Sequence, residues 1–302
     1  MSKPVSTLPH VLSGQRVELI DSKAGRISFY VDGPEQAEPM LLVHSINAAA
    51  SAHEIKPIFD VYKQRRRTYA IDLPGFGHSD RSQRQYCQTL MVDAVIAMLR
   101  EIRERHPDRG VDLLAVSLAC EFAAKAAVSE PDIVRTLGLV SPTGFAKITA
   151  THGPPDADLG KPMVHRIISL PLVGKALFGL LTIRPSIRFF LKKTWGKAEI
   201  DEEMFENAAR LSRTPNAHRA PLCFVAGYLF SADIRSVFRQ ITQPVWLSHG
   251  VRGDFVDYTQ TEGITEQSNW HTTVFDTGAL PYFEVPEEFI KAYDTFLELT
   301  QA

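Results

Sequence analysis

The most informative segment of this sequence reads Leu113-Leu114-Ala115-Val116-Ser117-Leu118-Ala119. Its apolar residues predict a buried strand, and an alanine-rich helical pattern follows directly after Ser117. A residue at the apex of such a tight strand-to-helix turn has a strained backbone conformation. The side chains two positions before and after it would collide unless they were very small. Both are alanine here, Ala115 and Ala119. We therefore interpret Ser117 as a candidate nucleophile; the simpler alternative is that it only caps the helix.

Two backbone N–H groups are candidates for stabilising a negative charge that develops beside Ser117. The N–H of Leu118 lies at the start of the predicted helix, where an anion is favoured. The second would come from the small-residue loop after the apolar run 40–44, in which Ile46 is the best candidate. The alternative for that loop is a plain connection between a strand and a helix.

Short apolar runs alternate along the chain with segments of helical period. This alternation predicts an α/β fold, with a mostly parallel sheet covered by helices on both faces. Between Pro142 and Gln243 helical patterns occur without a convincing strand, so we expect a helical lid over residues 145–239 and a core of 1–144 and 240–302. The expected strands cover residues 16–20, 26–31, 40–44, 68–73, 111–116, 136–140, 244–247 and 272–275.

In this order and spacing, the segments resemble the α/β-hydrolase fold superfamily, in particular its lidded serine hydrolases that need no cofactor. The resemblance extends over nearly the whole chain and implies an eight-stranded sheet, a lid insertion and a Ser-Asp-His triad. Ser117 matches the position of the nucleophile. Asp254, in the loop after the predicted strand 244–247, matches the position of the acid, with Asp257 in reserve. A serine at this turn excludes haloalkane dehalogenase and epoxide hydrolase chemistry, which place an aspartate there.

The catalytic histidine of that superfamily has no counterpart at the matching position. Tyr282 stands in its place, in the loop between the last predicted strand and the final helix. A phenol with a reference pKa of about 10 is a poor general base at neutral pH. His44 and His249, each at the end of a predicted strand, are candidate substitutes, although hydrogen bonds within their own loops explain them equally well. We therefore expect detectable but feeble hydrolysis.

Composition and charge narrow the possible partners. Of the 302 residues, 44% are hydrophobic and 23% are charged, and the net charge of −2 provides no global field to attract nucleic acid. Three scattered cysteines and histidines without ligand spacing predict neither a disulfide framework nor a metal site. We also expect no cofactor, no transmembrane segment, no signal peptide and a cytoplasmic location.

The favoured functional prediction is a serine hydrolase-like protein that acts on a small hydrophobic ester or acyl substrate, with catalysis impaired by Tyr282. The many apolar residues of the expected lid could form its core or line an apolar pocket. A second prediction, of a different class, is a non-catalytic pseudoenzyme that binds a hydrophobic small molecule or a protein partner. A lyase in which Tyr282 donates a proton ranks third.

Overall fold

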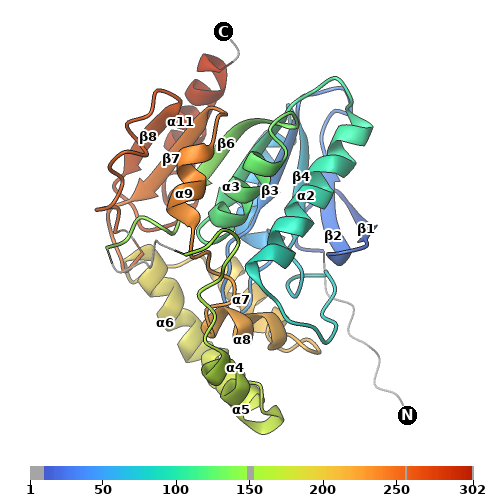
Figure 1. The fold of residues 1–302 in the computed structure, drawn as a ribbon, viewed down its shortest axis with the longest axis vertical. Helices are drawn as coiled ribbons and strands as arrows, with labels where there is room; N and C mark the ends of the chain where they lie inside the picture. Colours follow the sequence, from blue (N-terminus) through green and yellow to red (C-terminus); the bar gives the residue numbers. More distant parts are fainter. Residues whose placement is uncertain (1–9, 148–152, 256, 301–302) are drawn as a thin grey trace.

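The computed structural model describes residues 10–147, 153–255 and 257–300 (Figure 1). Residues 1–9 of the expected core and 148–152 of the expected lid therefore lie outside the described residues. The strands are β1 (Gln15–Asp21), β2 (Gly25–Asp32), β3 (Pro39–Val43), β4 (Arg67–Asp72), β5 (Val111–Val116), β6 (Val134–Val140), β7 (Val245–Gly250) and β8 (Trp270–Phe275).

These strands form one eight-stranded sheet in the order β1-β2-β4-β3-β5-β6-β7-β8. The pairs from β4 through β8 are all parallel, whereas β1 pairs with β2 and β2 with β4 in antiparallel fashion. Every residue of the central strands β3 and β5 is buried, as expected of parallel strands between two helical layers. The predicted fold class, an eight-stranded and mostly parallel sheet, is confirmed.

Helices cover both faces of this sheet (Figure 1). Leu113 and Ala115 of β5 pack into one apolar cluster and Leu114 and Val116 into the other, because successive side chains of a strand point to opposite faces. The first cluster includes residues of α2 (Gln88–Arg105), α3 (Ala119–Ser129) and α9 (Ile234–Gln240); the second includes residues of η1 (Ala52–Ile55), α1 (Lys56–Tyr62), α10 (Pro281–Glu284) and α11 (Pro286–Leu299).

A helical insertion separates β6 from β7. Trp195 and Phe205 belong to the same apolar cluster as Tyr282, so α6 and α7 are packed onto the body of the protein. By contrast, α4 and α5 project away from the sheet (Figure 1) and share with α8 only a small cluster around Ile168. The helices of the insertion are α4 (Pro162–Ile168), α5 (Pro171–Leu181), α6 (Arg184–Trp195), α7 (Glu202–Leu211) and α8 (Arg219–Val225).

Within the described part of the chain, no single helix is both long and apolar enough to cross a membrane. The segments Pro162–Ile168 and Leu172–Leu181 pass that test of length and composition only as a pair, and the pair is bent by 91°.

A buried ion cluster fixes the amino-terminal end of β5. Asp112 has no solvent exposure. Its carboxylate accepts hydrogen bonds from Arg66 at 2.5 Å, from Arg135 at 2.9 and 2.5 Å and from the Thr136 hydroxyl at 2.7 Å. Without Asp112, Arg66 would lose its ion-pair partner in a largely buried position, whereas Arg135 would keep its pair with Glu38 at 3.0 Å. An unpaired buried charge is more costly than never forming the pair.

We predict that Asp112→Ala lowers the free energy of unfolding by about 3–5 kcal/mol, because both guanidinium groups lose their buried partner. Urea denaturation followed by circular dichroism measures this loss. The matched control is Glu101→Ala, which removes an exposed ion pair with Arg105 and is expected to cost about 0.5 kcal/mol or less. Equal stability of the two variants would contradict the prediction.

Candidate active site

Ser117 lies in the turn between β5 and α3, with its backbone in the left-handed region at φ 57°. This conformation costs a residue with a side chain about 1–3 kcal/mol, so the surroundings must hold it. The Ser117 N–H donates to the carbonyl of Val140 at 2.8 Å, and its own carbonyl accepts from the Cys120 N–H at 3.0 Å. The N-cap position of α3 belongs to Leu118. The simpler interpretation, in which Ser117 serves only as the helix cap, is therefore wrong.

The hydroxyl of Ser117 and two backbone N–H groups have no hydrogen-bond partner among the described residues. The side chain of Ser117 is half-buried, and its hydroxyl makes no hydrogen bond among the described residues. The N–H groups of Leu118 and Ile46 lie in buried residues and donate to no acceptor in the described chain. Buried N–H groups are almost always paired in folded proteins, so these two donors are free to bind an acceptor such as water or a ligand oxygen.

Glu54 holds the loop that carries Ile46. Its carboxylate is buried in η1 and accepts hydrogen bonds from the N–H of Ser45 at 3.1 Å and from the Ser45 hydroxyl at 2.6 Å. The amide of Asn47 also donates to it. Sequence reasoning missed Glu54, because nothing in the pattern of η1 shows that its carboxylate folds back onto a loop nine residues earlier.

Tyr282, in α10, is almost fully buried, at 1% exposure. Its ring packs against Phe283 and Phe289, with centroids 5.2 and 5.5 Å away, and its hydroxyl has no hydrogen-bond partner among the described residues. Burial raises the pKa of Tyr282 well above its usual value, and the nearby Glu54 and Cys120 raise it further. The phenol therefore stays neutral at physiological pH, where it can donate a hydrogen bond but cannot accept a proton as a base.

His44 is engaged through both ring nitrogens. Its Nδ1–H donates to the Ser45 carbonyl at 2.6 Å, and its Nε2 accepts the N–H of Leu73 at 3.0 Å. These contacts occupy the lone pair that a general base would need. The substitute role that we considered for His44 therefore does not fit this arrangement, and the ring instead fixes two loops at the edge of the sheet.

His249 keeps one ring nitrogen uncommitted. Its Nδ1–H donates to the Gly250 carbonyl at 2.8 Å, its ring stacks on Tyr258 with centroids 3.8 Å apart, and burial lowers its pKa. The strand register aligns Ser117 with Ser141 and His249, because Val116 pairs with Val140 and Val140 with Ser248. Two strand spacings, about 10 Å, separate the Ser117 backbone from that of His249.

Neither candidate acid forms an ion pair or hydrogen bond with a histidine among the described residues. The carboxylate of Asp254 is 54% exposed and lies 2.8 Å from Nζ of Lys193 in α6. Asp257 accepts from the hydroxyl and the N–H of Thr259 and from the N–H of Lys147, and these hydrogen bonds lower its pKa. Among the described residues, neither Asp254 nor Asp257 therefore forms the acid–histidine pair that the resemblance implies.

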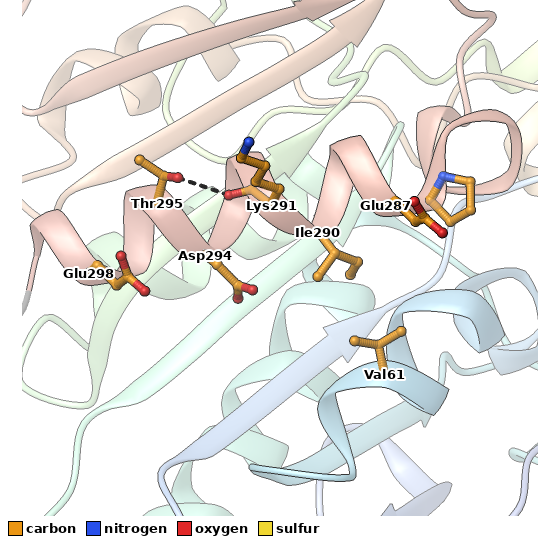
Figure 2. Close-up of a pocket in the computed structure, with 8 residues that line it drawn as sticks. Val61, Glu287, Ile290, Lys291, Asp294, Thr295 and Glu298 are labelled. Carbon is orange, nitrogen blue, oxygen red and sulfur yellow. Dashed lines mark hydrogen bonds between the residues drawn. The ribbon is translucent and has the colours of Figure 1, made fainter.

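Among the described residues, no group of three or more His, Cys, Asp or Glu side chains could hold a metal ion. A surface groove of about 630 Å³ lies between α1 and α11, with Val61 and Ile290 at its apolar centre and charged side chains of α11 around it (Figure 2). None of its lining residues belongs to the turn or the loops described above.

The family model of the α/β hydrolase fold matches residues 38–176. The chain has the α/β-hydrolase fold. It is similar to a probable hydrolytic enzyme from Pseudomonas aeruginosa PAO1, with a TM-score of 0.71, 18% identity and 95% of each chain covered.

Two further α/β-hydrolase structures show how widely the chemistry on this fold varies. Carboxylesterase CesB from Bacillus subtilis has a TM-score of 0.67 and 15% identity, with 95% of this chain and 93% of that chain covered. A haloalkane dehalogenase loop variant from Bradyrhizobium elkanii has a TM-score of 0.69 and 17% identity, with 95% and 97% covered. No curated protein sequence matches the chain. These likenesses show the fold, and function must be argued from the site.

Directly after the serine turn of this α/β-hydrolase fold, α3 buries a carboxyl group. Glu121 is 1% exposed and accepts hydrogen bonds from the Thr143 hydroxyl at 2.5 Å and from the Ser231 N–H at 2.8 Å. Burial raises its pKa to about 7, and these hydrogen bonds together with Lys125 offset only part of that rise. An acid with a raised pKa keeps its proton in the folded protein at a pH where the unfolded chain has already released it.

We predict that Glu121→Gln removes a pH dependence of stability. As the pH rises from about 4.5 to 7, the wild type loses stability relative to the variant, by about 3 kcal/mol in total, because only its unfolded state is ionised in that window. Below this window both states are protonated and the difference vanishes. Urea unfolding of both proteins between pH 4.5 and 8 measures this difference in the free energy of unfolding. If the two free energies changed with pH in the same way, the raised pKa of Glu121 would be contradicted.

Proposed function

We propose that the protein is a slow serine hydrolase of small hydrophobic carboxylic esters, with Ser117 as the nucleophile. The strained backbone of Ser117, at φ 57°, is the observation that carries this proposal. A protein that only binds its ligand gains nothing from holding a serine in a conformation that costs free energy. A carboxylesterase among the structures with the same fold adds support for this class of substrate.

In the proposed reaction, the Ser117 oxygen attacks the acyl carbon of the ester and the carbonyl oxygen becomes an oxyanion. The unpaired N–H groups of Leu118 and Ile46 would donate to that oxyanion, and Glu54 would keep the Ile46 loop in place. Collapse of the intermediate breaks the bond to the leaving alcohol and leaves Ser117 acylated. Water then hydrolyses this acyl group and restores the serine.

Proton transfer is the weak part of this site. The neutral phenol of Tyr282 cannot take the Ser117 proton, and the carboxylate of Asp254 is engaged with Lys193. The proton must then leave to solvent. In a well-studied serine protease the loss of the triad histidine costs about a million-fold in turnover, while about a thousand-fold or more over water survives. We infer residual hydrolysis of that order.

We infer further that the insertion serves as a lid for an apolar substrate. Its helix α7 lies against η1, and the Asn207 amide donates to the Ser51 hydroxyl at 3.2 Å. Met204 and Phe205 of α7 join the apolar cluster that contains Ala52 and Tyr282. An insertion held this way encloses the loops beside Ser117 with hydrocarbon, which favours a hydrophobic acyl or alcohol group in the substrate.

The alternative function is a pseudoenzyme that binds a hydrophobic molecule without turnover. Tyr282 favours it, because a buried phenol occupies the position where the resemblance expects the catalytic base. The serine itself distinguishes the two functions, since a poised nucleophile reacts with acylating or phosphonylating reagents and an inert serine does not.

We predict that a fluorophosphonate probe labels the wild-type protein slowly, at one site, and that Ser117→Ala abolishes the labelling. Mass spectrometry of the tryptic peptide identifies the modified residue. The matched control Ser248→Ala changes a buried hydroxyl two strands away and is expected to leave labelling intact. A wild type that remains unlabelled would favour the pseudoenzyme.

We predict that Tyr282→His raises nitrophenyl ester hydrolysis by about 10²–10⁴-fold, the usual contribution of a positioned general base. Tyr282→Phe is the control: it keeps the packing, removes only an unpaired hydroxyl and should leave the rate unchanged. Combining Tyr282→His with Ser117→Ala should abolish the gain. If the folded histidine variant is no faster than wild type, our assignment of the base position is wrong.

A further inference from the structure

We propose that helices α4 to α6, together called the arm and comprising residues 162–195, dock on the surface of an anionic lipid bilayer. This inference goes beyond the proposed hydrolysis and does not rest on it, because it concerns a surface that Ser117 does not touch. The argument combines the exposure of apolar side chains, the distribution of charge and the shape of the arm.

The arm exposes more hydrocarbon than any other part of the described chain. Ten of the 17 large apolar side chains that are exposed lie between residues 163 and 190. Leu172 is 86% exposed, Met163 69%, Leu180 65% and Ile167 55%. Isolated exposed apolar residues are ordinary, but a group of this size concentrated on one projection marks a surface that is covered in use.

Helix α5 shows this exposure of apolar side chains most clearly. Its sequence, Pro-Leu-Val-Gly-Lys-Ala-Leu-Phe-Gly-Leu-Leu, contains a single charged residue, Lys175. A helix that is apolar all round is expected in a protein core or in contact with lipid. Among the large apolar side chains of α5 that the structure describes, Phe178 is buried, whereas Leu172 and Leu180 are exposed. The arm ends at α4 and α5, far from the sheet (Figure 1).

The charge of this region has one sign. From Lys161 to Lys197 the sequence contains eight Lys or Arg residues and no Asp or Glu, although the whole chain carries a net charge of −2. A mixture of exposed apolar and basic side chains matches the boundary between the headgroups and acyl chains of an anionic bilayer. The eight residues are Lys161, Arg166, Lys175, Arg184, Arg188, Lys192, Lys193 and Lys197.

These eight cations divide into two groups. Arg184 and Arg188 pair with Glu206 and Glu202 of α7, and Lys193 and Lys197 pair with Asp254 and Glu284 of the body. These four pairs tie the base of the arm to the rest of the protein. The other four, Lys161, Arg166, Lys175 and Lys192, form no ion pair with any described residue. They remain available for lipid phosphate groups.

The shape of the arm suits contact with the surface of a bilayer rather than a span across it. α4 and α5 contain 7 and 11 residues, and the pair is bent by 91°. At 1.5 Å per residue, neither helix approaches the roughly 30 Å of a hydrocarbon core. Short helices with basic residues among exposed apolar ones lie along the interface instead. The arm also leaves the carboxyl end of β6, the edge of the sheet that carries Ser117, so docking would turn this edge toward the lipid.

A second copy of the chain is a poorer occupant of this surface. In a symmetric dimer the same patch faces itself, so the unpaired cations of two arms would be brought together. Their repulsion would oppose the apolar contact, whereas an anionic bilayer satisfies both features.

Vesicle flotation of the full-length protein tests the proposal. We expect wild type to float with vesicles of phosphatidylcholine and phosphatidylglycerol and to bind vesicles of phosphatidylcholine alone at least about tenfold more weakly. Leu172→Ser combined with Leu180→Ser, and separately Arg166→Glu combined with Lys175→Glu, should each weaken binding by about tenfold or more. All four side chains project from the arm, so the fold is retained, which circular dichroism verifies.

Matched controls change the same residue types outside the arm. Ile20→Ser and Lys23→Glu alter exposed side chains of the opposite sheet edge and should leave binding unchanged. Absence of wild-type binding to either vesicle would overturn the proposal, and so would arm variants that bind as well as wild type. A dimer in solution that the leucine pair disperses, without vesicle binding, would assign the surface to a second copy and equally overturn it.

Discussion

The hydrogen bond from the Ser117 N–H to the Val140 carbonyl is the constraint on which the candidate site depends. It extends the pairing of β5 with β6 one residue past the end of the strand and fixes a serine in a region of φ that side chains avoid. Small neighbours make the turn possible, but only the parallel sheet supplies the acceptor. The conformation of Ser117 therefore depends on the sheet register as well as on its small neighbours.

Around this turn, the buried polar groups are distributed unevenly. Glu54 is saturated with donors, and His44 uses both nitrogens, whereas the Tyr282 hydroxyl and the N–H groups of Leu118 and Ile46 have no partner in the described chain. The hydrogen bonds of Glu54 and His44 order the loops that they join. The unpaired N–H groups of Leu118 and Ile46 are the donors that the proposed hydrolysis would use.

Sequence pattern predicted the sheet well, because burial on both faces makes parallel strands continuously apolar. The range of β5 was predicted without error, whereas β7 continues three residues beyond its apolar run through the polar Ser248 and His249. Ser117 was found through its small neighbours. The role of Glu54 and the pairing of Asp254 with Lys193 were not predictable, since each depends on which distant loop folds against it. Only the resemblance placed Asp254 in the site. In the structure its carboxylate pairs with Lys193.

The order in which this protein folds follows from the same turn. Val140 is 23 positions after Ser117 in the chain, and the crossover helix α3 must dock before β6 can lie beside β5. Until that hydrogen bond forms, the Val140 carbonyl cannot help to offset the cost of the left-handed backbone of Ser117. We therefore expect this conformation of Ser117 to form only after the contact between β5 and β6, which are distant in the chain.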